Sequence, residues 1–283
     1  MVLFPLRVLL LVWVPAAVLA APSVVEESFS TKFVPDRSST PISLPVLVVR
    51  PDDGGRHPLA LLLHGRGVSE ADNLRLGRAD FPANARYLAQ RGYAVLIPTR
   101  IGYGITGGAD LEYTGPCHHK SPLPALRHAA REMKQVLSAA QSRPWADAGR
   151  TIAIGDSFGG LIALALTADR PTGLKGVVNV SGGDGGDSLQ HVDAPCDPTA
   201  LETALGILGK ESRVPALFLY SANDRFWGPT WPERWFAAWQ AGGGGGAFER
   251  LAADKNNGHF IFNRNAEAWH GPVERFLKRL DLP

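Results

Sequence analysis

Short apolar segments alternate along this chain with longer segments of helical periodicity. Residues 58–64 form a continuous apolar run, which is typical of a strand buried on both faces. Beyond that run, predicted strands and helices alternate, an order that indicates a mostly parallel sheet with helices on both faces. The eight predicted strands are 23–34, 43–50, 58–64, 93–98, 150–155, 174–181, 214–221 and 247–252. The predicted helices are 82–91, 122–141, 157–168, 198–208, 229–240 and 266–280.

The first residues have the pattern of a secretory signal peptide. Arg7 supplies a positive charge, residues 8–19 form an apolar run, and Ala20 and Ala21 are small residues suited to cleavage. We therefore predict a signal peptide at 1–21, a single domain at 22–283, and a periplasmic or secreted mature protein. An uncleaved membrane anchor is the alternative, although the apolar run is shorter than the roughly 20 residues of a spanning helix.

Charge and cysteine content narrow the function classes. The 29 basic and 27 acidic residues nearly cancel and form no long run of one sign, so neither nucleic acid nor an anionic membrane is expected as a partner. The only two cysteines, Cys117 and Cys196, match no zinc or haem spacing. In an exported chain their simplest use is one disulfide, and two unpaired thiols are the alternative. No metal or cofactor is expected.

One motif indicates chemistry. The segment Gly155-Asp-Ser157-Phe-Gly159 lies where a β-branched run gives way to an Ala/Leu-rich helix. Flanking glycines permit a sharp turn that would lift the Ser157 hydroxyl clear of the sheet. We predict that Ser157 is a nucleophile; a purely structural turn is the alternative.

Two further strand ends supply the partners that such a serine needs. Asp224 follows the predicted strand 214–221, and His259 follows the strand 247–252. Ligands gather at the carboxyl ends of parallel strands, and a serine hydroxyl needs an imidazole base held by a carboxylate. We predict a Ser157–His259–Asp224 triad; a solvated turn aspartate and a loop histidine without a partner are the alternatives. Asp156, next to the nucleophile, is interpreted as pocket polarity.

Acyl transfer also needs donors for the oxyanion that develops on the carbonyl oxygen. The backbone N–H of Phe158, at the predicted helix start, is one candidate. The second is the amide of Arg66, in the loop after the strand 58–64, where neighbouring glycines give the backbone freedom. His64 is interpreted as a structural hydrogen-bonding residue beneath that loop.

These residues carry a resemblance to a known family. The order of elements, His64-Gly65, the segment 155–159, Asp224 and His259 resemble the α/β-hydrolase fold over nearly the whole mature chain. Residues 217–229 and Gly258-His259 are similar to exported bacterial proteins of the dienelactone hydrolase group. That group proper has cysteine where Ser157 stands here, so the resemblance implies a serine esterase and leaves the dienelactone substrate in doubt.

The sequence therefore predicts a cofactor-free serine hydrolase that acts on small carboxylic esters. One alternative is a small prolyl-oligopeptidase-like peptidase, although such enzymes usually add a propeller domain that this chain is too short to hold. Another is a catalytically silent member of the fold that serves as a binding module. The sequence gives no indication of the oligomeric state.

The short chain segment between two of the predicted strands indicates a site without a cap domain. Only one predicted helix, 198–208, separates the strands 174–181 and 214–221, so no large cap domain fits there. We expect the pocket walls to come from residues 100–121, from residues 182–198, and from the aromatic side chains of Phe226, Trp227 and Trp231. Packing of the following helix is the alternative use of these aromatics. An uncapped pocket of this kind predicts short-chain, soluble esters.

Overall fold

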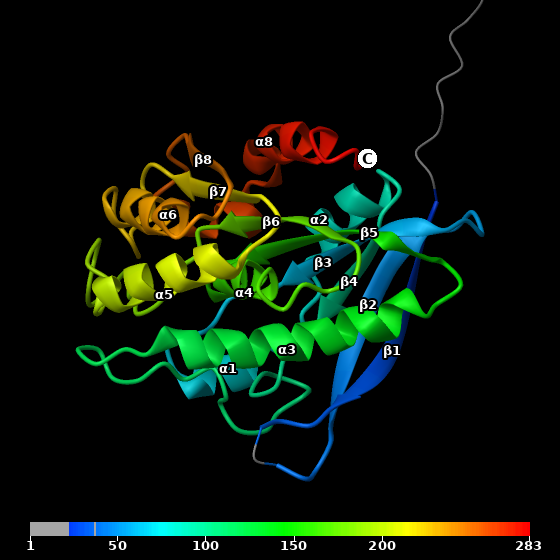
Figure 1. Cartoon of the computed structure of the whole chain (residues 1–283), viewed down its shortest axis with the longest axis horizontal. Coiled ribbons are helices and arrows are strands. Elements are labelled where there is room, and N and C mark those ends of the chain that lie inside the picture. The colour runs from blue at the N-terminus through cyan, green and yellow to red at the C-terminus, as the bar shows by residue number, and fades with distance from the viewer. Residues whose placement is uncertain (1–22, 37) are drawn as a thin grey trace, which may run out of the picture.

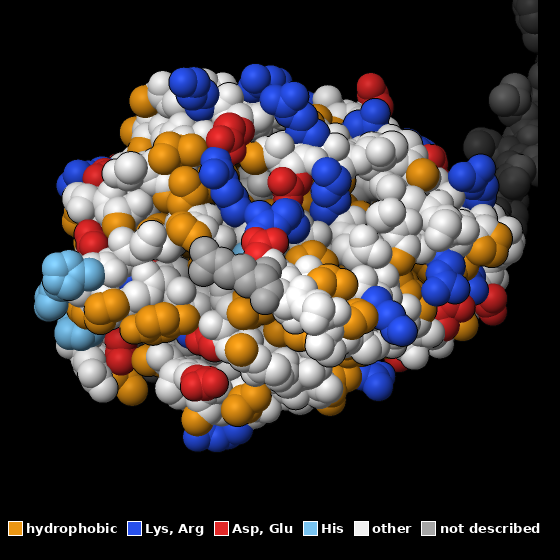
Figure 2. All heavy atoms as spheres, turned by 60° about the horizontal axis from the view of Figure 1, so that its bottom comes forward, with side chains coloured by type: hydrophobic (Ala, Val, Ile, Leu, Met, Phe, Trp, Pro, Cys, Tyr) orange, Lys and Arg blue, Asp and Glu red, His pale blue; other side chains and the backbone are white. Residues whose placement is uncertain are grey.

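The computed structural model describes residues 23–36 and 38–283 of the chain (Figure 1). The predicted signal peptide at 1–21 lies outside these residues. Within them, no helix has both the length and the apolar character that crossing a bilayer requires. Basic and acidic side chains are interspersed on the face shown in Figure 2.

A single sheet of eight strands organises the described residues. Its spatial order is β1-β2-β4-β3-β5-β6-β7-β8, which confirms the eight predicted strands. The pairs β1/β2 and β2/β4 are antiparallel, and every pair from β4/β3 to β7/β8 is parallel. The strands are β1 (Val24–Phe33), β2 (Ile42–Pro51), β3 (His57–Leu63), β4 (Ala94–Pro98), β5 (Ala146–Asp156), β6 (Leu174–Val180), β7 (Ala216–Ser221) and β8 (Gly246–Leu251).

Helices cover both faces of this sheet, and Figure 1 shows α3 and α5 on one side and α2 and α8 on the other. Successive side chains of β3 point to opposite faces of the sheet, and each face has its own hydrophobic core. Leu59, Leu61 and Leu63 belong to the core that includes apolar residues of α3, α4, α5 and α6, whereas Ala60 and Leu62 belong to the core that includes those of α2, α7 and α8. The helices are α1 (Glu70–Arg75), α2 (Pro82–Ala89), α3 (Pro122–Gln141), α4 (Phe158–Leu166), α5 (Pro198–Glu211), α6 (Trp231–Ala241), α7 (Ile261–Arg264) and α8 (Ala266–Lys278), with a 3₁₀ turn, η1, at Gly258–Phe260.

Three short elements, α1, η1 and α7, were not predicted. They have too few residues to show an apolar period. Helix α1 begins with a capping box in which Ser69 accepts from the Asp72 amide and Asp72 accepts from the Ser69 amide. That signature is visible in the sequence, but no amphipathic segment follows it.

The loops at the carboxyl end of the sheet are tied together covalently. Cys117, in the loop between β4 and α3, forms a disulfide with Cys196, in the loop between β6 and α5, as predicted. Between β6 and β7 the chain forms only this loop and α5, so no large cap domain is inserted there.

Candidate active site

The chain turns sharply between β5 and α4. Ser157 has φ 54° and ψ −126°, a conformation that a side-chain-bearing residue adopts only under strain. A Cβ at position 155 would collide with the Gly159 carbonyl, and one at position 159 would collide with the backbone at Leu63, so both positions require glycine. The turn places the Ser157 hydroxyl at the carboxyl end of the sheet.

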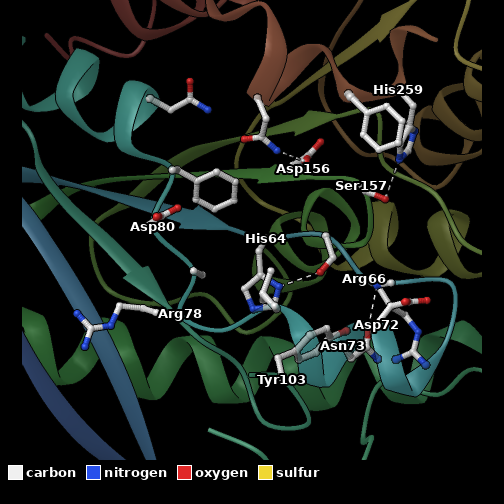
Figure 3. Close-up of a pocket in the computed structure, with 18 of the residues that line it drawn as sticks. His64, Arg66, Asp72, Asn73, Arg78, Asp80, Tyr103, Asp156, Ser157 and His259 are labelled. Atoms are coloured by element: carbon white, nitrogen blue, oxygen red, sulfur yellow. Dashed lines mark hydrogen bonds between the residues drawn. The ribbon is translucent and has the colours of Figure 1, made fainter. Parts of the chain in front are cut away.

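The structure brings Ser157, His259 and Asp224 together. The distance from His259 Nε2 to Ser157 Oγ is 3.2 Å (Figure 3). The distances from His259 Nδ1 to Asp224 Oδ2 and Oδ1 are 3.0 and 3.2 Å. Asp224 follows β7 and also accepts a 2.9 Å hydrogen bond from the Phe226 amide. The side chain of Asn257 accepts from the His259 amide and thereby caps η1. Three separate strand ends thus supply one hydrogen-bonded chain of side chains.

Both the electrostatics and the packing of His259 suit a base. Burial lowers its pKa, but the Asp224 carboxylate, with a smaller contribution from Asp156, more than offsets this effect, so the pKa lies above its usual value. The Phe226 ring stacks on the imidazole at 3.9 Å between centroids, and the Trp227 ring lies edge-on at 5.4 Å. These contacts fix the orientation of the imidazole between its two partners.

Two backbone amides beside Ser157 are free to donate. Within residues 23–36 and 38–283, neither the Arg66 amide nor the Phe158 amide donates a hydrogen bond. Phe158 is the first residue of α4, where amides have no partner within the helix. The Arg66 side chain is occupied elsewhere, because its guanidinium is paired with Asp110 at 2.6 Å from Nη1 to Oδ1. Gly65 brings this loop close to Ser157, since a Cβ there would lie 3.1 Å from the serine Cβ.

A buried hydrogen-bond network that was not predicted contacts the backbone of the loop after β3. Arg100 Nη1 donates to the His64 carbonyl at 2.6 Å, and Arg100 Nε donates to Glu112 at 2.5 Å. Tyr103 also donates to Glu112. His64 Nδ1 lies 2.8 Å from the Gly65 carbonyl, and burial together with Arg100 holds the pKa of His64 well below its usual value. His64 is therefore a neutral hydrogen-bonding residue beneath the loop.

No model of a known protein family matches the chain, and no curated protein matches it in sequence. Solved structures do match. A candidate dienelactone hydrolase from Klebsiella pneumoniae subsp. pneumoniae MGH 78578 superposes with a TM-score of 0.60 at 19% identity, over 92% of this chain and 99% of that chain. Acetyl xylan esterase 1 from Thermoanaerobacterium sp. JW/SL YS485 gives 0.59 at 15% identity, over 92% and 89%. The chain has the α/β-hydrolase fold.

A third similarity involves a longer protein with the same fold. The uncomplexed acylaminoacyl peptidase of Pyrococcus horikoshii gives a TM-score of 0.60 at 14% identity. The match covers 90% of this chain but only 41% of the peptidase, so this chain corresponds to less than half of that protein.

Two cavities of this α/β-hydrolase fold meet at Ser157. The larger has a volume of about 730 Å³, and its lining includes His259, Phe260 and Asn263. Figure 3 shows His259, Ser157 and Asp156 near one another in this cavity. The smaller has a volume of about 90 Å³ and is lined by Lys120, by residues 183–186 and by Trp227. Residues that line both are Arg66, Gly67, Val68, Ser157 and Phe226.

The residues that line the two cavities overlap only in part with those expected from the sequence. Phe226 lines both cavities and Trp227 lines the smaller one. Trp231 lines neither of these cavities: its ring stacks against Trp235, and the guanidinium of Arg234 lies over it. These contacts correspond to the alternative use of this aromatic side chain, which is packing of the helix. The wall that was not expected comes from residues 66–84, which include α1 and the start of α2.

Asp156 reaches the larger cavity. Its carboxylate is buried and accepts a hydrogen bond from Asn263 at 3.1 Å. Burial, with a smaller contribution from Asp224, raises the pKa of Asp156 to about 7. A titratable acid thus lies directly beside Ser157.

Among the described residues, one group of side chains has the spacing of possible metal ligands. It consists of Cys117, His191 and Cys196, whose ligand atoms lie within 4.8 Å of one another. Both sulfurs are bonded to each other, so this group has only one free ligand, the imidazole.

Proposed function

We propose that this protein is a serine hydrolase that cleaves carboxylic esters through an acyl-enzyme on Ser157. The observation that carries the proposal is the continuous chain of hydrogen bonds from Asp224 through His259 to Ser157, beside two free amides. A Ser-His-Asp arrangement with adjacent amide donors is the machinery of acyl transfer on several unrelated folds.

Each group has one task in the proposed reaction. His259 Nε2 takes the proton of Ser157 Oγ as the oxygen attacks the ester carbonyl, and Asp224 stabilises the resulting imidazolium. The amides of Arg66 and Phe158 donate to the oxyanion. His259 then gives its proton to the leaving alcohol, and a water molecule releases the acid by the same steps in reverse order.

We also propose short acyl chains as the preferred substrates. The smaller cavity, of about 90 Å³, offers room for only a small acyl group. Exported location stays part of the proposal, and the Cys117–Cys196 disulfide supports it because such bonds persist in oxidising compartments.

A peptidase is the second candidate, because the acylaminoacyl peptidase shares the fold. Purified protein should be assayed on 4-nitrophenyl esters from acetate to palmitate and on the matching 4-nitroanilides, with Ser157→Ala as the control. The ester proposal expects turnover that is highest for short acyl chains, at least about a hundredfold below that level on anilides, and absent in Ser157→Ala. Faster anilide cleavage would favour the peptidase. Equal activity of Ser157→Ala would reject both, and inactivity of a folded wild type would favour a binding module.

A further inference from the structure

The proposed function assigns a different part of the ester to each cavity, and the inference below rests on it. His259 must protonate the leaving oxygen, and it lines the larger cavity but not the smaller. The alcohol therefore extends into the larger cavity. The acyl group, which stays on Ser157, faces the smaller cavity, lined by Phe158 and Trp227.

The smaller cavity holds a carboxylate without a hydrogen bond. Asp184 is only 8% exposed, yet among the described residues it accepts no hydrogen bond, and its nearest cation, Lys120 Nζ, lies 3.7 Å away. Lys120 Nζ instead donates to Thr114 at 3.0 Å. The Asp184 carboxylate lines the cavity, so a donor on a bound substrate can hydrogen-bond to it there.

The walls of the cavity hold Asp184 in place. A Cβ at position 183 would lie 2.6 Å from the Trp227 ring, so this loop packs directly on the indole. The Trp227 Nε1–H donates to the Ser181 carbonyl at 2.7 Å, and the Cys196 amide donates to the Gly185 carbonyl at 2.8 Å. Asp184 is therefore presented by a segment fixed on both sides.

The charges of the cavity select among polar acyl groups. A carboxylate on the acyl chain would be repelled by Asp184, and an ammonium would be repelled by Lys120. A hydroxyl is neutral, can donate to Asp184 and can accept from the lysine ammonium. We infer that the smaller cavity selects short hydroxyacyl groups, so that the substrates are esters of small hydroxy acids bound through Asp184 and Lys120.

The test compares ethyl lactate with ethyl isobutyrate, which replaces the hydroxyl by a methyl group and keeps the same leaving alcohol. Each kcat/KM is divided by the rate constant for hydrolysis by hydroxide, which removes intrinsic reactivity. The inference expects a lactate preference of at least about tenfold in the wild type, because a site built for a hydroxyl disfavours the analogue that lacks it. Asp184→Ala should bring the ratio close to one. Asp193→Asn, an exposed acid in the same loop, should keep the wild-type ratio.

A second variant covers the case in which Asp184→Ala does not fold. Lys120→Met leaves Asp184 uncompensated, so the protonated form of ethyl alaninate should gain at least about tenfold relative to ethyl lactate. Equal normalised rates for lactate and isobutyrate in the wild type, or a lactate preference that survives in folded Asp184→Ala, would overturn the inference. No gain for ethyl alaninate in Lys120→Met would also overturn it. Absence of any ester hydrolysis would instead reject the proposed function itself.

Discussion

Replacing Arg100 by methionine should destabilise the protein strongly. The side chains of Arg100 and Glu112 are 0% and 2% exposed, and two Arg100 nitrogens donate to the Glu112 carboxylate at 2.5 and 3.1 Å. Arg100 also donates to the His64 carbonyl at 2.6 Å. The Arg100→Met variant would leave the buried Glu112 carboxyl group without its cation.

The magnitude follows from the cost of an uncompensated buried charge. Removing one partner of a buried pair costs about 3–5 kcal/mol in the free energy of unfolding. For a domain of this size each kcal/mol lowers Tm by roughly 2–4 °C, so a decrease of roughly 6–20 °C is expected. Turnover should also fall, because the His64 carbonyl lies directly before the loop that presents the Arg66 amide.

Chemical denaturation of the oxidised protein measures the effect. The matched control is Arg75→Met, since Arg75 pairs with Asp72 on the surface at 72% and 42% exposure. That variant should lose no more than about 1 kcal/mol. The double variant Arg100→Met/Glu112→Leu should recover much of the lost stability, because it removes both charges together. If Arg100→Met lost no more than Arg75→Met, the buried network would not support the loop as described.

Three further variants have expected outcomes. Asp224→Asn should lower kcat by about four orders of magnitude with little change in Tm, because the imidazole loses its orienting carboxylate; a decrease below tenfold would argue against the triad. Burial raises the pKa of Asp156 to about 7 from 3.8, so the free energy of unfolding falls as pH rises through that interval, and Asp156→Asn should be more stable than the wild type at pH 8. The Asp156 carboxylate also raises the pKa of His259, which must be neutral to act, so the same variant should move the acid limb of kcat/KM to lower pH, and a shift to higher pH would contradict this coupling. The Cys117→Ser/Cys196→Ser variant should lose about 4.5 kcal/mol of stability, because the disulfide closes a loop of 79 residues; a non-reduced digest of the wild type that contained only free thiols would refute the pairing.

The sheet and the three candidate catalytic side chains could be predicted from the sequence because they depend on local patterns. Strand β3 is a continuous apolar run, and both Asp224 and His259 follow predicted strands closely enough that the sheet itself delivers them. Gly155 and Gly159 mark the turn at Ser157, since no other residue fits there. A residue that follows a strand after only a short connection has little freedom to lie elsewhere, so the predicted strand largely determines its position.

The cavity walls could not be predicted because they depend on contacts between distant loops. Lys120 and Asp184 meet only after the loops following β4 and β6 are brought together. Trp231 lies only a few residues after Trp227, yet the start of α6 turns its ring onto Trp235 and away from both cavities. Proximity in sequence to the candidate catalytic residue Asp224 therefore did not determine which aromatic side chains line the two cavities.

Covalent labelling of Ser157 tests the central claim most directly. A fluorophosphonate reacts only with a serine whose hydroxyl is activated, so intact-mass and peptide analysis of the treated protein should find one adduct per chain, on the peptide that contains Ser157. Labelling should be absent in Ser157→Ala and much slower in His259→Ala. A folded wild-type protein that gained no adduct, or that was modified equally well as Ser157→Ala, would contradict the account.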